Sequence, residues 1–406
     1  MPATPPHGDP APRDGSIPEF ALGALGTRPF GVYVHVPFCA TRCGYCDFNT
    51  YTAGELNGGA SPRSWLDGLR GELDLAATVL GAAPAADTVF VGGGTPSLLG
   101  AEGLASVLDA VRGAFGLAPG AEVTTESNPE STSPEFFDGI RAAGYTRVSL
   151  GMQSAAPHVL RVLDRVHTPG RPVEAAREAR DAGFAHVNLD LIYGTPGERT
   201  EDLRASLDAV LAAGVDHVSA YALIVEDGTA LARKIRRGEL PPPDDDVLAA
   251  DYELIDKVLA GAGLRWYEVS NWAAGRNARC GHNLGYWQGG DWWGAGPGAH
   301  SHVGGVRWWN VKHPARYAEL VSAGQSPAAG RELLSADDRH LERVMLELRV
   351  AEGLPLTALD DAGVREARAA AVEGLLDAAL LDAAGRAVLT DRGRLLADGI
   401  VRRLLG

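Results

Sequence analysis

The sequence has 406 residues, of which 45% are hydrophobic and 22% charged, as expected for a soluble chain with one large and one small domain. Its formal net charge of −15 opposes non-specific binding to polyanions such as nucleic acid and anionic lipid. No apolar run is long enough to span a bilayer, and four cysteines, three of them within eight residues, exclude an extracellular disulfide framework.

The N-terminal segment is rich in Pro and Gly and lacks the apolar stretch of a signal peptide. This composition predicts a disordered tail over residues 1–27 that carries no targeting signal. A cytoplasmic location is therefore expected.

Short β-rich runs alternate with longer amphipathic helical patterns from Phe30 onward. The predicted strands are 30–36, 87–93, 122–127, 147–152, 186–194 and 217–224. Such alternation indicates a parallel α/β sheet. Glycine or polar residues stand where each strand should end, as in barrels that bind ligands at the carboxyl ends of their strands. We therefore predict an α/β fold, a partial (βα)6 TIM-like barrel, over residues 28–243.

The rest of the chain differs in composition. Seven of the eight tryptophans lie between Trp266 and Trp309, so residues 244–330 are predicted to form an aromatic-rich extension that closes the barrel. Helical patterns with two short β-runs predict a small helical, winged-helix-like C-terminal domain over residues 331–406.

The strongest motif is CATRCGYC, which places Cys39, Cys43 and Cys46 directly after the first predicted strand. Three thiolates on one loop can ligate three irons of a [4Fe–4S] cluster and leave the fourth iron open. The amino and carboxylate groups of S-adenosylmethionine suit that iron, and one-electron transfer could then cleave a carbon–sulfur bond to give a 5′-deoxyadenosyl radical.

The main alternative is a structural zinc site, which normally needs four ligands in a closed tetrahedron. No fourth ligand lies nearby in sequence, although Cys280 or a distant histidine could supply one. A set of three unrelated buried thiols is a further alternative. The strand that precedes the motif favours the cluster.

Many blocks along the chain resemble one family in the right order. They include VYVHVPFCATRCGYCDF, FVGGGTPS, TESNP, RVSLGMQS, LDRVH, NLDLIYGTPGE, YEVSNWA, HNLGYW and GAGPGAHS. From about residue 28 to the C-terminus, the chain is similar to the radical SAM coproporphyrinogen dehydrogenase-like proteins. The resemblance implies a (βα)6 partial barrel followed by a helical C-terminal domain.

The resemblance also implies a site for S-adenosylmethionine. Its implied residues are Tyr33 and Tyr45 at the nucleotide, Gly93, Gly94 and Thr95 beside the methionine moiety, Glu126 at the methionyl end, and Gln153, Arg165 and Asp190 in the polar wall. Taken singly, the glycines are also typical of a turn, and Glu126, Arg165 and Asp190 could form a structural ion network.

One departure decides between branches of this family. The dehydrogenases resemble Cys-x3-Cys-x2-Cys-x-Cys, whereas here Phe48 stands two positions after Cys46. Phe48 and the HNLGYW stretch at 282–287 resemble the heme chaperone branch, so a coproporphyrinogen dehydrogenase is disfavoured. The resemblance implies bound heme, with His282 as its candidate iron ligand, because neutral imidazole is a usual axial ligand.

Other residues compete for the heme. Cys280, His300 and His302 are rival ligands. The apolar surroundings of a heme could come from Tyr286, Trp287, Trp292 and Trp293. The alternative is that these aromatic residues only pack the mouth of the barrel, and that His282 is a hydrogen-bonded core residue.

Three functions follow from these patterns. The favoured one is a heme chaperone that passes heme to an unknown acceptor protein, with membrane contact only peripheral and through that acceptor. The second is radical oxidative decarboxylation of coproporphyrinogen III. The third, a DNA-binding winged helix, is disfavoured by the acidic charge; we expect the C-terminal domain to be a lid or docking surface.

Overall fold

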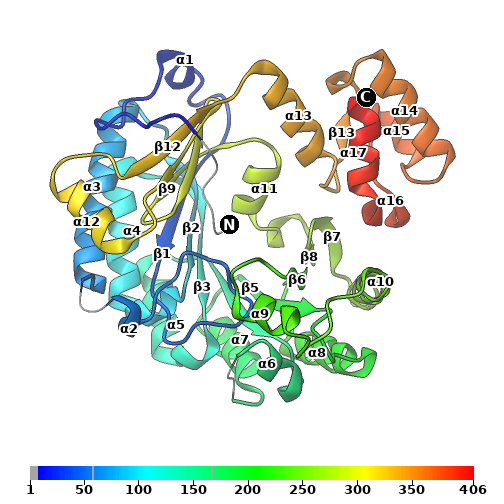
Figure 1. The fold of residues 1–406 in the computed structure, drawn as a ribbon, viewed down its shortest axis with the longest axis horizontal. Coiled ribbons are helices and arrows are strands. Elements are labelled where there is room, and N and C mark those ends of the chain that lie inside the picture. Colours follow the sequence, from blue (N-terminus) through cyan, green and yellow to red (C-terminus); the bar gives the residue numbers. More distant parts are fainter. Residues whose placement is uncertain (1–7, 57–58, 166–167) are drawn as a thin grey trace.

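Six parallel strands form the centre of the structure, a computed structural model that describes residues 8–56, 59–165 and 168–406 (Figure 1). They pair in sequence order from β1 to β6 within a twelve-stranded sheet. Their bounds are β1 Phe30–Val36, β2 Ala86–Gly93, β3 Leu117–Ser127, β4 Arg147–Gln153, β5 His186–Tyr193 and β6 His217–Ala222. The predicted parallel α/β partial barrel is confirmed.

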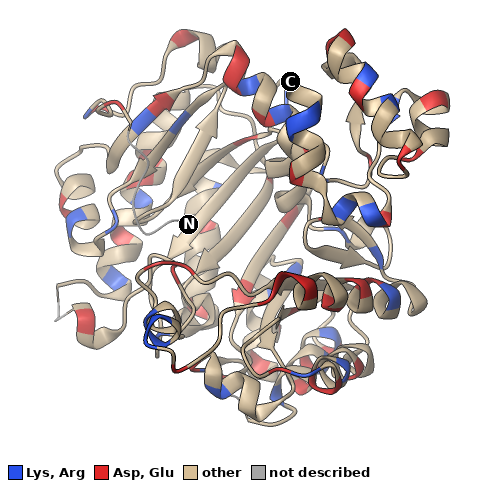
Figure 2. Cartoon of the chain, turned by 45° about the vertical axis from the view of Figure 1, so that its right-hand side comes forward, with Lys and Arg blue, Asp and Glu red and all other residues tan. Residues whose placement is uncertain are grey.

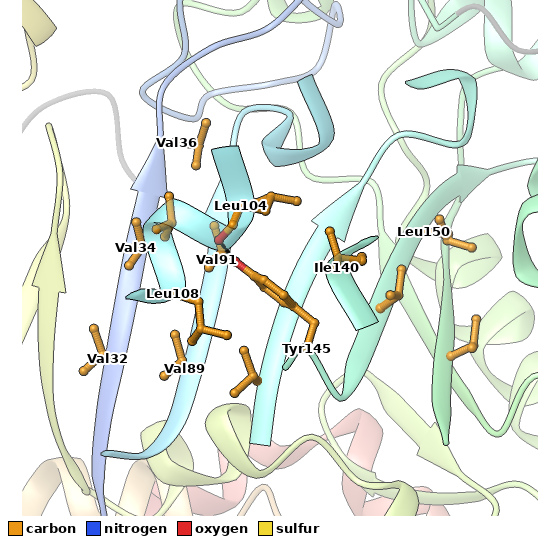
Figure 3. Close-up of a cluster of buried hydrophobic side chains, with 14 of the residues drawn as sticks. Val32, Val34, Val36, Val89, Val91, Leu104, Leu108, Ile140, Tyr145 and Leu150 are labelled. Atoms are coloured by element: carbon orange, nitrogen blue, oxygen red, sulfur yellow. Dashed lines mark hydrogen bonds between the residues drawn. The ribbon is translucent and has the colours of Figure 1, made fainter. Parts of the chain in front are cut away.

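Alternation along β1 separates an apolar outer face from a polar inner face. Val32, Val34 and Val36 are fully buried in the largest hydrophobic core, whereas Tyr33 and His35 point to the opposite side of the sheet. Burial of each valine contributes about 1.5–3 kcal/mol. Figure 3 shows this core, which also holds Val89, Val91, Leu104, Leu108, Ile140, Tyr145 and Leu150.

Helices connect the strands and cover the outer face of the barrel (Figure 1). Their bounds are α2 Ala53–Leu56, α3 Pro62–Leu80, α4 Gly100–Phe115, α5 Pro134–Ala143, α6 Pro157–Val162, α7 Arg171–Asp181, α8 Thr200–Ala213, α9 Ala230–Arg236 and α10 Asp245–Gly261. Among the described helices, none combines the length and apolarity that a bilayer crossing requires.

The aromatic-rich extension adds strands to both edges of the six-stranded sheet. On one edge, β7 (Arg265–Glu268) and β8 (Asn271–Ala273) follow β6 in antiparallel pairing. On the other, β9 (Asp291–Ala295) pairs in parallel with β1. The remaining elements are β10 His300–Val303, β11 Val306–Asn310, α12 Pro314–Ser322 and β12 Ala328–Leu333.

This arrangement differs from the predicted closure of the barrel by residues 244–330. The sheet order begins at β12 and ends at β7, so the added strands widen an open sheet. The short helix α11 (Gly281–Trp287) instead packs on β1 and β2 at the base of the barrel. The predicted domain boundary at residue 331 falls inside β12, because β12 pairs with β11 in the large sheet.

A separate C-terminal unit has its own hydrophobic core, which begins at Val344. Its elements are α13 Ala336–Glu347, β13 Leu354–Pro355, α14 Asp361–Val372, α15 Ala378–Ala384, β14 Arg386–Ala387, α16 Asp391–Leu395 and α17 Ala397–Leu405. The unit is anchored on the barrel by Arg394, which pairs with Asp256 at 3.0 Å and covers the Trp266 ring at 4.7 Å.

Residues 8–27 are ordered against the barrel, unlike the disordered tail predicted for residues 1–27. Asp9 forms a β-bridge with Arg331, and α1 (Glu19–Leu22) buries Ala21 completely. Sequence composition misses this because the partners lie far along the chain. Residues 1–7 are outside the described residues.

Charges of both signs are interspersed over the helices seen in Figure 2. In the C-terminal unit, Arg403 pairs with Glu366 and Glu373, and Arg349 pairs with Asp398. These arginines are therefore engaged by carboxylates of the unit itself.

Candidate functional site

A cavity of about 1340 Å³ lies within the barrel and extends from the carboxyl ends of its strands to α11 at the base. It exceeds the roughly 300–1,000 Å³ typical of a single small-molecule site, so it has room for more than one group. Its walls come from the loop after β1, from the ends of β2 to β6 and from α11, and Arg394 and Leu395 of α16 border it.

Cys39, Cys43 and Cys46 lie on the loop after β1, are half-buried and all line the cavity. Burial raises the pKa of Cys39, and it raises the pKa of Cys46 to about 11. These two thiols therefore hold their protons at neutral pH until a metal displaces them. The donor set fits a cluster that takes one thiolate per iron.

The backbone of the cysteine loop is clamped between two helices. Gly44 N donates to Leu163 O at 3.0 Å, and Gly44 O accepts from Leu231 N at 2.8 Å. A Cβ at Gly44 would collide with the Asp164 carboxylate, which pairs with Lys234 at 3.0 Å. The loop thus has a defined position before any metal binds.

Cys280 is not placed to act as the fourth ligand that a structural zinc site would need. Cys280 Sγ lies 3.5 Å from Glu122 Oε1 at the base of the barrel, opposite the end that carries Cys39, Cys43 and Cys46. Within the described residues, no group of three His, Cys, Asp or Glu side chains is placed to hold a single metal ion. A cubane cluster with one thiolate on each of three irons does not require the thiolates to converge on a single ion.

The glycine segment after β2 packs against the cysteine loop. Gly94 N donates to Val36 O, and Thr95 N donates to Phe38 O, both at 2.7 Å; Thr95 Oγ1 lies 3.7 Å from Cys39 Sγ. Gly93 has a φ of 111° and would bring a Cβ to 2.6 Å from the His35 ring. The close approach that requires glycine here is to the protein's own loop.

Substitution Gly94→Ala is expected to displace the cysteine loop, because the new Cβ would collide with the Phe38 carbonyl oxygen and backbone cannot move aside cheaply. We expect a several-fold loss of iron bound after reconstitution, measured per chain. Gly113→Ala is the control, since no atom lies within 4 Å of its Cβ position in α4 and alanine favours a helix by about 0.5–1 kcal/mol. Equal iron content in both variants would contradict the packing role.

Two acidic side chains, Glu126 and Asp190, line the cavity and repel each other when both are ionised. Glu126 Oε2 accepts from Gly93 N at 2.9 Å, and burial, reinforced by Asp190, raises the pKa of Glu126 to about 8. Burial also raises the pKa of Asp190, although Ser149 and Asn188 donate to its carboxylate at 3.1 and 2.6 Å. Both acids lack a full complement of compensating charge, which a cationic ligand would supply.

Arg165 and Gln153 complete the polar wall. Arg165 Nη1 lies 3.5 Å from Cys43 Sγ, and its Nη2 donates to Gly151 O at 3.2 Å, so its guanidinium links the cysteine loop to β4. Gln153 has a φ of 67°, next to a register shift between β4 and β5. This uncommon backbone conformation turns Gln153 toward the cavity. The last two residues of the LDRVH block, 166–167, are outside the described residues.

Tyr33 and Tyr45 lie on the cavity wall, as the resemblance implies. Tyr33 Oη lies 3.0 Å from His35 Nδ1, and burial raises the pKa of both phenols. All nine residues implied for S-adenosylmethionine therefore line the same cavity as the three cysteines.

His282 is a hydrogen-bonded residue of the cavity floor, and its role as a heme ligand stays a prediction. Its Nδ1 lies 2.8 Å from Thr88 Oγ1 and its Nε2 lies 2.9 Å from Tyr286 Oη. The ring is 3% exposed and stacks on Phe90 with centroids 5.3 Å apart. Iron could reach a ring nitrogen only after one of these hydrogen bonds had broken.

Among the other predicted heme contacts, Cys280 and Tyr286 line the cavity, whereas Trp292, Trp293 and His302 do not. Trp293 packs edge-on against Trp308 in the core, and Trp292 packs between Tyr286 and His302. His302 Nδ1 lies 2.9 Å from Gly290 O. Trp292 and Trp293 therefore contact other aromatic side chains of the protein, because the pairing of β9 with its neighbouring strands fixes their positions.

A buried chain of hydrogen-bonded polar residues was not predicted from the sequence. Asn188 Nδ2 donates to Asp190 Oδ1 at 2.6 Å, and Asn188 Oδ1 lies 2.6 Å from His217 Nδ1. His217 Nε2 lies 2.7 Å from Tyr267 Oη. The available signal was polar residues at alternate positions of β5 and β6, on the inner face.

Comparisons with known proteins agree with this geometry. The family model described as the Radical SAM superfamily matches residues 33–210. The chain is 63% identical over 385 residues to the heme chaperone HemW of Mycobacterium tuberculosis strain H37Rv, covering 95% of this chain and 97% of that protein. It is 34% identical to the Escherichia coli heme chaperone HemW, covering 80% and 84%.

Among solved structures, the radical SAM enzyme HemN from Escherichia coli, a coproporphyrinogen III oxidase, superposes with a TM-score of 0.80. The match covers 97% of this chain and 94% of that one at 22% sequence identity. At this identity the likeness concerns the fold, which extends over the barrel and the C-terminal unit together.

Proposed function

Since the chain belongs to the heme chaperone HemW family of radical SAM proteins, we propose that it binds heme and transfers it to an acceptor protein, with a [4Fe–4S] cluster and an exchangeable S-adenosylmethionine as its cofactors. One observation carries this proposal: the three cysteines of the motif and the nine residues implied for S-adenosylmethionine line one cavity.

The residues fit these cofactors in separate roles. Cys39, Cys43 and Cys46 would supply the thiolates of the cluster. Glu126 and Asp190 would meet the positive charges of S-adenosylmethionine, which accounts for two buried acids with raised pKa values. When both cofactors are bound, they supply one-electron reduction of the sulfonium group.

Heme as the cargo rests on the family and on Phe48. The HemW of Mycobacterium tuberculosis matches 95% of the chain. Phe48, 46% exposed at the cavity rim, stands where the dehydrogenases have an additional cysteine. The chain therefore lacks the additional cysteine of the dehydrogenase pattern, which favours heme trafficking over decarboxylation.

Anaerobic reconstitution tests the proposal. With the cluster in place, heme and coproporphyrinogen III are added in separate reactions, and the Soret spectrum, the porphyrinogen products and 5′-deoxyadenosine are followed. We expect about one heme per chain and no decarboxylated porphyrinogen.

Transfer is tested by adding the heme-loaded protein to an apo-heme protein and separating the two by size. Heme in the acceptor fraction supports a chaperone. Turnover to protoporphyrinogen without tight heme binding would replace the proposal with the dehydrogenase.

A further inference from the structure

The start of α11 is held by an ion pair. One member accepts hydrogen bonds from backbone N–H groups, and the other donates to backbone carbonyl groups. Glu122 accepts from Gly281 N at 3.0 Å and from His282 N at 3.1 Å. Arg147, 1% exposed, donates at 2.8 Å to the carbonyl oxygens of Ala278 and Arg279 and pairs with Glu122 at 3.2 Å. We call Glu122 and Arg147 the clasp.

The polar side chains of α11 are turned into the barrel. His282 connects Thr88 of β2 to Tyr286, one helical turn further along. On another side of the helix, Asn283 and Trp287 lie against Glu268 of β7 and favour its ionised form, although burial raises the pKa of Glu268 to about 7. The polar side chains of the HNLGYW stretch thus interact with residues of the barrel and with one another.

Tyr286 is the member of this group that reaches the cofactor residues. It lines the cavity, and its charge state affects the pKa of Tyr33, while Glu126 affects that of Tyr286. The Tyr286 hydroxyl is oriented by His282 Nε2 at 2.9 Å. The direction in which this hydroxyl points is therefore set from outside the cofactor site.

We propose that α11 is the floor of the cofactor cavity, fastened by the Glu122–Arg147 clasp, and that His282 is a positioning residue that aims the Tyr286 hydroxyl at bound S-adenosylmethionine. The identity of the ligand rests on the proposed function; the floor itself does not. The HNLGYW stretch then serves the barrel interior, and heme is bound by other residues.

Two amide variants separate positioning from iron ligation. His282→Gln places an amide where Nε2 lies and keeps the contact with Tyr286, whereas His282→Asn places it where Nδ1 lies and keeps only Thr88. Affinity for S-adenosylmethionine is read from the change it causes in the electron paramagnetic resonance spectrum of the reduced cluster. We expect His282→Asn to weaken it about fivefold and His282→Gln to restore most of it, because one hydrogen bond is worth about 1 kcal/mol.

Heme titration of the same variants is expected to match the wild type in affinity and Soret position. His186→Gln is the control, because His186 pairs with Asp216 outside the cavity. Loss of heme binding in both His282 variants would overturn the proposal and make His282 a ligand. Equal affinity of Asn and Gln variants for S-adenosylmethionine would also overturn it. A wild-type protein that binds no heme would refute the proposed function alone.

The clasp has a readout that does not depend on the binding of S-adenosylmethionine. Cys280 is 3% exposed beside Glu122, and the other three cysteines of the chain are masked when the cluster is bound. In Glu122→Gln we expect alkylation of Cys280 to accelerate at least about tenfold, as the floor opens more often. An unchanged rate would contradict the clasp.

Tyr286→Phe guards against variants that merely fail to fold, since it keeps the ring and removes the hydroxyl. Its loss of affinity for S-adenosylmethionine should equal that of His282→Asn, and the double variant should be no weaker than either single one. Additive losses would show that His282 does not act through Tyr286.

Discussion

Replacing any one of Cys39, Cys43 and Cys46 with alanine is expected to abolish cluster assembly. With two thiolates, two irons of the cubane have no protein ligand. The other side chains of the loop include no donor as soft as a thiolate that could replace the missing one. Reconstituted wild-type protein should hold about four irons per chain, whereas each variant should hold close to none and should lose the visible absorption of the cluster.

Cys280→Ala is the matched control for these three variants. Its thiol lies at the base of the barrel beside Glu122, so iron content and the spectral response to S-adenosylmethionine should remain at wild-type values. If Cys280→Ala lost its metal while Cys43→Ala kept it, the cysteine loop would not be the cluster site, and a closed site that includes Cys280 would have to be considered again.

Glu72→Ala is expected to cause a large loss of stability. Glu72 is fully buried in α3 and accepts from Gly296 N at 2.7 Å, Asn310 Nδ2 at 2.7 Å and Tyr317 Oη at 2.6 Å. Alanine would leave three buried donors unpaired, at a cost of about 3–5 kcal/mol in total. The melting temperature should fall by roughly 5–10 °C.

The exposed Glu319 of α12 provides the control. Its side chain is 67% exposed and pairs with Arg316, three residues earlier on the helix surface. Glu319→Ala should change stability by less than about 0.5 kcal/mol. Equal melting temperatures for the Glu72 and Glu319 variants would show that the buried network contributes nothing net.

Glu72 also predicts a pH dependence with a definite sign. Burial raises its pKa from 4.5 to about 7 in the folded protein, so between these values the folded state binds more protons than the unfolded state. The contribution of Glu72 to the free energy of unfolding is therefore full below pH 4.5 and lost as the pH rises through about 7. Comparing Glu72→Gln with the wild type at about pH 5 and about pH 8, the wild type should lose relative stability at the higher pH.

The strands could be predicted to within two residues because their signal is local, except that β3 begins five residues before the predicted run 122–127. The run 30–36 coincides with β1, and 147–152 differs from β4 by one residue. In β1 the valines at alternate positions face the helices while Tyr33 and His35 face inward, and a period of two is readable without knowledge of any partner.

That the predicted site residues line one cavity could be foreseen for a related reason. Parallel strands in sequence order bring their carboxyl ends to one edge, so Glu126, Gln153 and Asp190 had to meet once the topology was right. The motif supplied the cysteines, and the resemblance supplied the roles. The close packing of Gly94 on Phe38 was not foreseen, because it depends on where a loop lies in space.

The tertiary structure alone decided what lies opposite each side chain. Whether His282 meets an iron or Thr88 depends on a contact across 194 positions of the chain, and whether residues 8–27 stay ordered depends on Arg331. The sequence by itself determined the barrel, the cysteine loop and the residues around the cavity, since periodicity and strand order are properties of neighbouring residues. Burial, hydrogen-bond partners and the floor made by α11 arise from contacts between distant segments, which no local pattern encodes.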